Sequence, residues 1–165
     1  MQKITLGIDN GTTGTIALIG SAGSIYDEIP TKEMLDGKKG RVIRRIDHAK
    51  LAEIISAAFD ASLRVGAHAY IERPFTGSAM MINTSVLSAR SFEAALIVLE
   101  QLGIGFTVID SKEWQKPLLG DVKGSAELKK ASKLRGLQLY PAHSAAINDH
   151  GDADGLLIAH YFHNR

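Results

Sequence analysis

Apolar and polar residues alternate near the start of the chain, and this alternation predicts β-strands. Apolar residues occupy every second position from Lys3 to Asp9, and a second strand pattern follows at 15–19. Asn10-Gly11 lies between them and favours a tight turn, because both residues tolerate a positive φ. With a third strand expected at about 24–30, the first three strands should form an antiparallel meander.

The rest of the chain alternates between helical and strand patterns. Apolar residues at helical spacing predict helices at about 47–62, with Asp47 as N-cap, and at 84–102. A cationic helix is expected at about 125–135, and a helix that is apolar nearly all round, and therefore buried, at about 152–162. Short apolar runs predict two strands, at 67–72 and 106–110, and a turn or short helix that carries Trp114 should follow the second one. This order of elements predicts an α/β protein with a mixed sheet flanked by helices.

The composition limits the size, the location and the metal chemistry. A chain of 165 residues, 45% of them hydrophobic, is long enough for one core and short for two, so residues 1–165 are interpreted as a single domain. The absence of cysteine excludes thiolate ligands, so any metal must be bound by Asp, Glu or His, as Mg²⁺ is. Without a leader or an apolar run of about 18 residues, we expect a cytoplasmic protein and no membrane segment.

Basic residues gather in two stretches, although the net charge is only +1. The first stretch contains Lys32, Lys38, Lys39, Arg41, Arg44 and Arg45, and the second contains Lys123, Lys129, Lys130, Lys133 and Arg135. We interpret residues 38–45 as a mobile hairpin that follows phosphates, and the face with Lys129, Lys130 and Lys133 as a second phosphate contact. The alternative is that both stretches are solvated surfaces without a ligand.

Three carboxylates stand where predicted strands end or a predicted helix begins. They are Asp9, Glu72 and Asp154. If the fold brings them together, their mutual repulsion calls for a divalent cation such as Mg²⁺ or Mn²⁺. Two such ions could support the hydrolysis of a phosphodiester. The alternative is that each acid is a solvated strand end or a helix cap.

Three segments, with a fourth in support, resemble the RuvC-type Holliday-junction resolvases of the RNase H-like superfamily, the small phage-borne members most of all. The segments are Gly7–Gly11 (GIDNG), Ala69–Phe75 (AYIERPF) and Asp152–Ala159 (DADGLLIA), and the fourth is Val108–Lys116 (VIDSKEWQK). The resemblance covers nearly the whole chain and implies an RNase H-like fold, with three antiparallel strands followed by two parallel ones. It implies an Mg²⁺-dependent endonuclease, with Mn²⁺ as a substitute and no organic cofactor, that cuts four-way or branched DNA and carries Asp9, Glu72 and Asp154 as catalytic and metal-binding residues.

The resemblance also implies a fourth active-site group, three or four residues before Asp154. Gly151 and His150 occupy these positions. His150 ranks first because helical i, i+4 spacing would place it on the same side as Asp154. Asp152 ranks second, also as a metal ligand, and Asp149 third. The alternative is that His150 is a surface residue that caps a helix.

Further DNA contacts and a dimer are implied. Phe75 lies three residues after Glu72, the position at which resembling resolvases stack an aromatic ring on bases at the branch point; the alternative is a ring packed under its own loop. Arg73 and Lys116 are further candidate DNA contacts. The resemblance also implies a homodimer formed through the helix at 84–102, since the arms of a junction are related by two-fold symmetry.

Other functions remain open. Gly7–Thr15 also resembles the first phosphate loop of the ATP-binding sugar kinases related to actin and Hsp70, but those proteins need a second large domain for which 165 residues leave no room. A junction-binding module without catalysis would bind DNA and never cut it. An RNase H-like nuclease acting on RNA or on RNA–DNA hybrids would use the same acidic centre.

Overall fold

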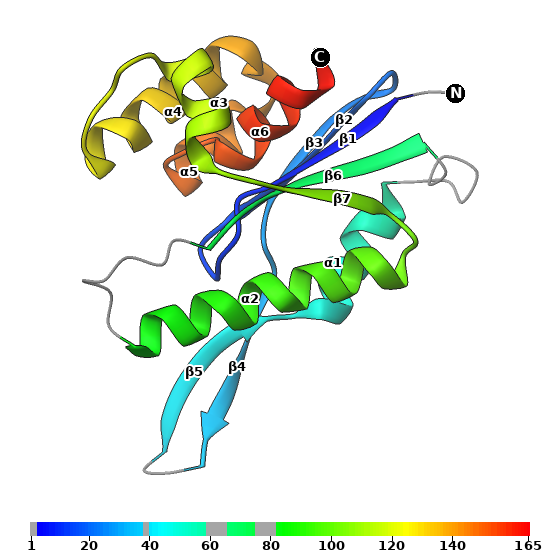
Figure 1. The fold of residues 1–165 in the computed structure, drawn as a ribbon, viewed down its shortest axis with the longest axis vertical. Helices are drawn as coiled ribbons and strands as arrows, with labels where there is room; N and C mark the ends of the chain where they lie inside the picture. Colours follow the sequence, from blue (N-terminus) through cyan, green and yellow to red (C-terminus); the bar gives the residue numbers. More distant parts are fainter. Residues whose placement is uncertain (1–2, 38–39, 59–65, 75–81) are drawn as a thin grey trace.

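A five-stranded sheet with the strand order β3-β2-β1-β6-β7 organises the fold (Figure 1). The computed structural model describes residues 3–37, 40–58, 66–74 and 82–165. The strands of this sheet are Ile4–Ile8 (β1), Thr15–Gly20 (β2), Gly23–Glu28 (β3), Ala67–Glu72 (β6) and Gly105–Ile109 (β7). β2 pairs antiparallel with both β1 and β3, whereas β6 pairs parallel with both β1 and β7. The predicted mixed sheet and its strand directions are confirmed.

Helices cover both faces of this sheet (Figure 1). They are His48–Ala57 (α1), Ile82–Gln101 (α2), Ser111–Leu119 (α3), Ser125–Leu139 (α4), Ser144–His150 (α5) and Asp154–His163 (α6), with a 3₁₀ turn at Pro141–His143. One hydrophobic core lies between the sheet and α1 and α2, and a second lies between the sheet and α3, α5 and α6. Because β1 is covered on both faces, all five of its residues are buried.

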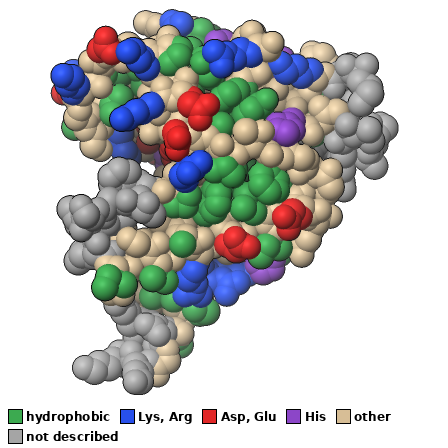
Figure 2. Space-filling view, in the orientation of Figure 1, with side chains coloured by type: hydrophobic (Ala, Val, Ile, Leu, Met, Phe, Trp, Pro, Cys, Tyr) green, Lys and Arg blue, Asp and Glu red, His purple; other side chains and the backbone are tan. Residues whose placement is uncertain are grey.

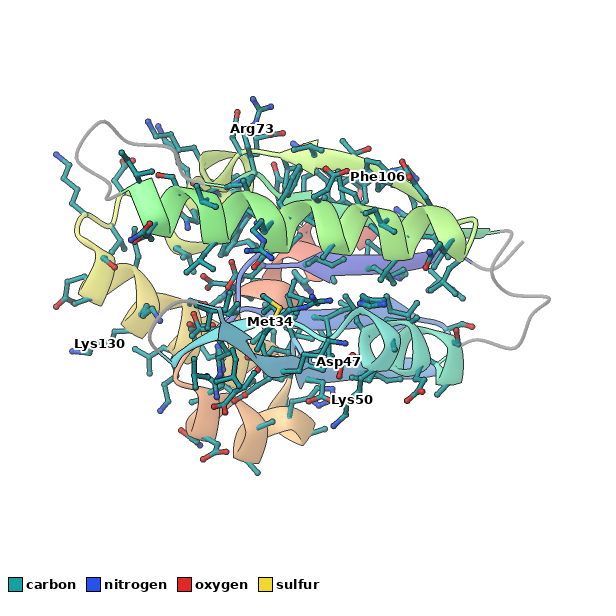
Figure 3. The ribbon with its side chains drawn as sticks, turned by 90° about the horizontal axis from the view of Figure 1, so that it is seen from below. Met34, Asp47, Lys50, Arg73, Phe106 and Lys130 are labelled. Carbon is teal, nitrogen blue, oxygen red and sulfur yellow. The ribbon has the colours of Figure 1, made fainter. Side chains whose placement is uncertain are left out.

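Several helix boundaries differ from those that the sequence predicts. Asp47 caps α1 as expected and accepts a hydrogen bond from the backbone N of Lys50 (Figure 3). The helix ends at Ala57 rather than near residue 62, and α4 continues to Leu139. The short α5 was not predicted, because only Ile147 of its seven residues is buried and so no apolar period marks it.

A hairpin formed by Thr31–Asp36 (β4) and Arg41–Ile46 (β5) makes a separate two-stranded sheet that projects from the body (Figure 1). The hairpin interpreted from the basic stretch is therefore present. Its two strands were not predicted as such, because charged residues interrupt the apolar alternation. Leu35 and Val42 are cross-strand partners and are 71% and 51% exposed, so this part of the hairpin has no apolar cover.

The long helix α2 packs on α1, β5 and β7 with only part of its surface. Its buried residues are Ser91, Ala95, Val98 and Leu99, while Val86 is 49% exposed although the helical pattern placed it on the packed side. Among the described residues, α2 is the one helix whose length and composition would suffice to cross a membrane, which is by itself a weak indication. The predicted dimer contact through this helix stays a prediction.

Two glycines allow α6 to lie directly against the sheet. A Cβ on Gly7 of β1 would overlap the backbone of Gly155 and Ala159, and a Cβ on Gly155 would lie 2.7 Å from the carbonyl oxygen of Thr15. The backbone N of Gly155 also donates to the Thr15 hydroxyl over 3.0 Å. This contact fixes the start of α6 beside the carboxyl end of β1.

Candidate active site

Parallel pairing places Asp9 and Glu72 side by side at one edge of the sheet. Ile8 of β1 lies opposite Ile71 of β6, so the residues that follow them leave the sheet at the same edge. The carboxyl groups of Asp9 and Glu72 are within hydrogen-bonding reach of each other. Carboxyl ends of neighbouring parallel strands are a usual place for a functional site.

The start of α6 adds two more carboxylates to this edge. Candidate ligand atoms of Asp9, Asp152 and Asp154 all lie within 4.8 Å of one another. Asp154 is the first residue of α6, and Asp152 belongs to the turn just before it. We call Asp9, Glu72, Asp152 and Asp154 the acidic site. The structure thus brings together the three acids singled out from the sequence and the second-ranked candidate for the fourth group.

Burial and mutual repulsion raise the pKa values in the acidic site. The pKa of Asp9 lies well above its ordinary value, first through desolvation and then through the negative charges of its three neighbours. Desolvation and then the charge of Asp152 raise the pKa of Asp154 to about 7. Desolvation also raises the pKa of Glu72, against hydrogen bonds with Trp114 and Asp9 that lower it. Such concentrated negative charge is stable only when protons or a cation compensate it.

Side chains from three other elements hold these acids in place. Trp114 of α3, which is fully buried, donates from Nε1 to Oε1 of Glu72 over 3.1 Å. Ser132 of α4 donates a short hydrogen bond to Oδ1 of Asp154. Lys129, also of α4, lies 3.3 Å from Oδ2 of Asp152, and the hydroxyl of Tyr26 on β3 donates to the Asp152 carbonyl over 2.7 Å. Three of the four acids, Glu72, Asp152 and Asp154, are therefore held by side chains from outside the acidic site.

The acidic site fits a hard divalent cation. Its potential ligands are carboxylate oxygens, the donors that Mg²⁺ and Mn²⁺ prefer. The side chain of Asp152 is only 3% exposed. Among the described residues, Lys129 is the one Lys or Arg that pairs with any of these four acids. Beside Asp9, the amide atoms of Asn10 are buried without a hydrogen-bond partner. Unpaired buried polar atoms of this kind often mark a place for a bound water or ion.

His150 does not occupy the position that the helical pattern predicts. It ends α5, and Gly151 then adopts the left-handed conformation with φ 100°, so His150 and Asp154 belong to different helices. The i, i+4 relation expected between them is wrong. His150 instead bridges two carboxylates, with Nδ1 3.2 Å from Oε1 of Glu28 and Nε2 3.4 Å from Oδ1 of Asp152. It therefore borders the acidic site through Asp152, while Asp149 is exposed.

The predicted basic contacts on α3 and α4 differ in what they touch. Lys129 and Lys133 share one side of α4, where Lys129 meets Asp152 and Lys133 donates to the carbonyl of Asn148 over 3.4 Å. Lys130 is exposed and points outward (Figure 3). Figure 2 shows Lys and Arg side chains gathered over α3 and α4. Lys116 and Lys123 line a pocket of about 290 Å³ between these helices.

The other predicted DNA contacts lie just after β6, on the hairpin, or outside the described residues. Arg73 follows β6 and pairs with Asp110 over 3.3 Å, with both side chains well exposed. Arg44 and Arg45 line a groove of about 260 Å³ between the hairpin and α2. Phe75, Lys38 and Lys39 lie outside the described residues, as does the side chain of Arg41.

Sequence reasoning missed most of the residues that orient the acids. Ser132 and Tyr26 are buried polar residues on elements far from the acids in sequence, and Lys129 was interpreted only as a phosphate contact. Their partners depend on how α4 and β3 pack, which no local pattern reports. One signal was available, since a single tryptophan in a short helix after a strand needs a partner for its indole N–H when buried.

The strand order, the parallel β1–β6 pair and the helices on both faces define an RNase H-like fold. No protein-family model matches the chain, and no curated protein matches it. A solved structure of Thermus thermophilus RuvC in complex with a Holliday junction substrate is similar over 95% of this chain and 90% of that chain, at 14% identity and a TM-score of 0.55. A second Thermus thermophilus RuvC structure matches over 94% and 90%, at 16% identity and a TM-score of 0.49. The similarity to the first of these two structures shows that the chain has the fold of RuvC.

Proposed function

We propose that this protein is a metal-dependent endonuclease that resolves four-way or branched DNA junctions by hydrolysing phosphodiesters. The observation that carries the proposal is the acidic site, in which atoms of Asp9, Asp152 and Asp154 lie within 4.8 Å at the carboxyl edge of a RuvC-like sheet. The similar solved structure is that of a RuvC bound to a Holliday junction substrate. A shared fold alone does not establish a function. The proposal therefore depends on the carboxylates of the acidic site.

In this proposal the ligands are Asp9, Glu72, Asp152 and Asp154, and the cation is Mg²⁺ or Mn²⁺. A bound cation of this kind supplies a water of lowered pKa and polarises the phosphate. The protein itself supplies the orientation of the ligands. Trp114 holds Oε1 of Glu72 through a hydrogen bond. Asp152 is the fourth active-site group in this proposal. His150 lies between Glu28 and Asp152 and orients Asp152 without being a ligand itself.

DNA contacts are proposed on two basic surfaces. The first comprises Lys116, Lys123, Lys129, Lys130 and Lys133 on α3, α4 and the loop between them, and the second comprises Lys38, Lys39, Arg41, Arg44 and Arg45 of the hairpin, with Arg73 and Phe75 after β6. Each phosphate contact that is lost should reduce the slope of log K against log salt by about 0.9. Lys130→Gln should therefore weaken junction binding and flatten its salt dependence, since Lys130 is exposed and has no role in orienting the acids.

The assembly and location belong to the same proposal. We propose a single RNase H-like domain over residues 1–165 that acts in the cytoplasm as a homodimer, with α2 in the interface. Exposed apolar residues along α2 support this interface; they are Ile82, Val86 and Ile97. Two copies would present two acidic sites to the symmetric arms of a junction.

The deciding experiment compares a labelled four-way junction, a matched duplex, a single strand, an RNA and an RNA–DNA hybrid, each with Mg²⁺ and with EDTA. We expect paired symmetric nicks in the junction only, lost in EDTA and in Asp9→Asn, Glu72→Gln, Asp152→Asn and Asp154→Asn. The control is Asp149→Asn, an identical change at an exposed acid nearby, which should cut normally. Equal cutting of plain duplex would refute the junction specificity, cutting of hybrids or RNA instead would reassign the substrate, and binding without cutting would indicate a non-catalytic module.

A further inference from the structure

One side of α4 contacts the turn that carries two acids of the acidic site. Lys129, Ser132 and Gly136 are spaced by three and four residues and therefore share this side of the helix. Lys129 pairs with Asp152, and Ser132 bonds to the residues at the start of α6. This side of α4 thus meets the turn along two helical turns.

The backbone approaches closely at Gly136. A Cβ there would overlap the Cβ of Ala153, and the fully buried Ile147 lies next to it. Glycine is consequently required for α4 to come this near to the turn. The close approach is what places the Ser132 hydroxyl, one turn earlier in the helix, between Ala153 and Asp154.

The direction of the Ser132 hydroxyl follows from its two partners. The backbone N of Ala153 is 3.1 Å from Oγ of Ser132 and can only donate, so Oγ accepts this bond. A serine hydroxyl carries one hydrogen, and it is left for Oδ1 of Asp154. Ser132 is 1% exposed, so water does not compete for either bond. One carboxylate oxygen of Asp154 is thereby held, and Oδ2 remains for another partner.

We propose that Ser132 is a positioning residue for the acidic site, which orients Asp154 so that Oδ2 faces Asp9 and Asp152 for cation binding. The inference rests on the proposed function, because it assumes that these acids bind a divalent cation. Without the hydroxyl, Asp154 can rotate away from its neighbours, and the Ala153 N–H is left buried without a partner. Loss of a group that orients a metal ligand lowers metal affinity by about 10- to 100-fold in other proteins.

The test measures Mn²⁺ affinity by electron paramagnetic resonance in the full-length protein, independently of cleavage. Ser132→Ala should weaken Mn²⁺ binding at least about tenfold, and Ser132→Thr, which keeps a hydroxyl, should restore most of it. Ser91→Ala is the matched control, because Ser91 is also a buried helical serine, 4% exposed, on the other side of the sheet. Circular dichroism of each variant verifies the fold before the affinity is compared.

A double-mutant cycle with Asp154→Asn separates positioning from general damage. If Ser132 acts through Asp154, Ser132→Ala should add no further loss of Mn²⁺ affinity in the Asp154→Asn background. Unchanged affinity in Ser132→Ala, or the same additional loss in both backgrounds, would overturn the inference. A wild-type protein that binds no Mn²⁺ would overturn it together with the proposed function, whereas the Ser132 effect without junction cleavage would overturn the proposed nuclease alone.

Discussion

Replacing Asp154 by Asn should stabilise the metal-free protein at neutral and alkaline pH. The pKa of Asp154 is raised from 3.8 to about 7, first by desolvation and then by the charge of Asp152. Such a group favours the folded state while it is protonated. As the pH rises from 3.8 towards 7, the unfolded chain releases this proton before the folded chain does, so stability falls and then stays low above pH 7.

The size of the effect follows from the two pKa values. The interval between 3.8 and about 7 corresponds to about 4 kcal/mol, an upper limit because the neighbouring acids share protons with Asp154. Asparagine is neutral at every pH and can still accept the hydrogen bond from Ser132. In a chain of this length each 1 kcal/mol shifts Tm by about 2–4 °C. Asp154→Asn should therefore raise the metal-free Tm at pH 8 by at most about 8–16 °C and change it little at pH 4.

Thermal unfolding in EDTA across this pH range measures the effect. Asp121→Asn serves as control, because Asp121 is exposed and forms a surface ion pair with Lys116 over 3.7 Å, so its replacement should leave Tm nearly unchanged. Added Mg²⁺ should stabilise the wild type at pH 8 and the variant much less. A variant that is less stable than the wild type at pH 8, or a difference that does not grow with pH, would refute the reasoning.

Three further substitutions test how the acidic site is built. Gly155→Ala should cost about 1–3 kcal/mol, measured by urea unfolding, because a Cβ would lie 2.7 Å from the Thr15 carbonyl oxygen; an unchanged midpoint would contradict the close packing of α6. Trp114→Phe should keep the fold but lower junction cleavage about 10- to 100-fold, since Glu72 loses its indole donor; full activity would show that this bond is dispensable. His150→Ala should lower the cleavage rate less than loss of any acid does, and an equal loss would make His150 a ligand in its own right.

The sheet could be predicted because its strands carry their own signals. Residues 3–9 alternate with period two and the run at 67–72 is apolar between polar flanks, and the structure has strands at both places. The hairpin strands β4 and β5 give no such signal, since charges interrupt their alternation and Leu35 remains exposed. A strand is recognised in a sequence by the apolar alternation that burial of one face requires. A strand outside the core lacks this alternation and is therefore missed.

The candidate site illustrates where local patterns stop being informative. Asp9 and Glu72 could each be placed at the end of a strand from the local pattern, but only the family resemblance predicted that they meet, because no local pattern reports which strands are neighbours in the sheet. The choice between His150 and Asp152 turned on whether a helix is continuous from 150 to 154, and the left-handed Gly151 interrupts it. Glycine at that position was visible in the sequence and is a frequent helix terminator. Two residues separated by such a glycine should therefore not be assigned to one helical face. Asp152 lies in the turn between the two helices, and its carboxylate is close to those of Asp9 and Asp154.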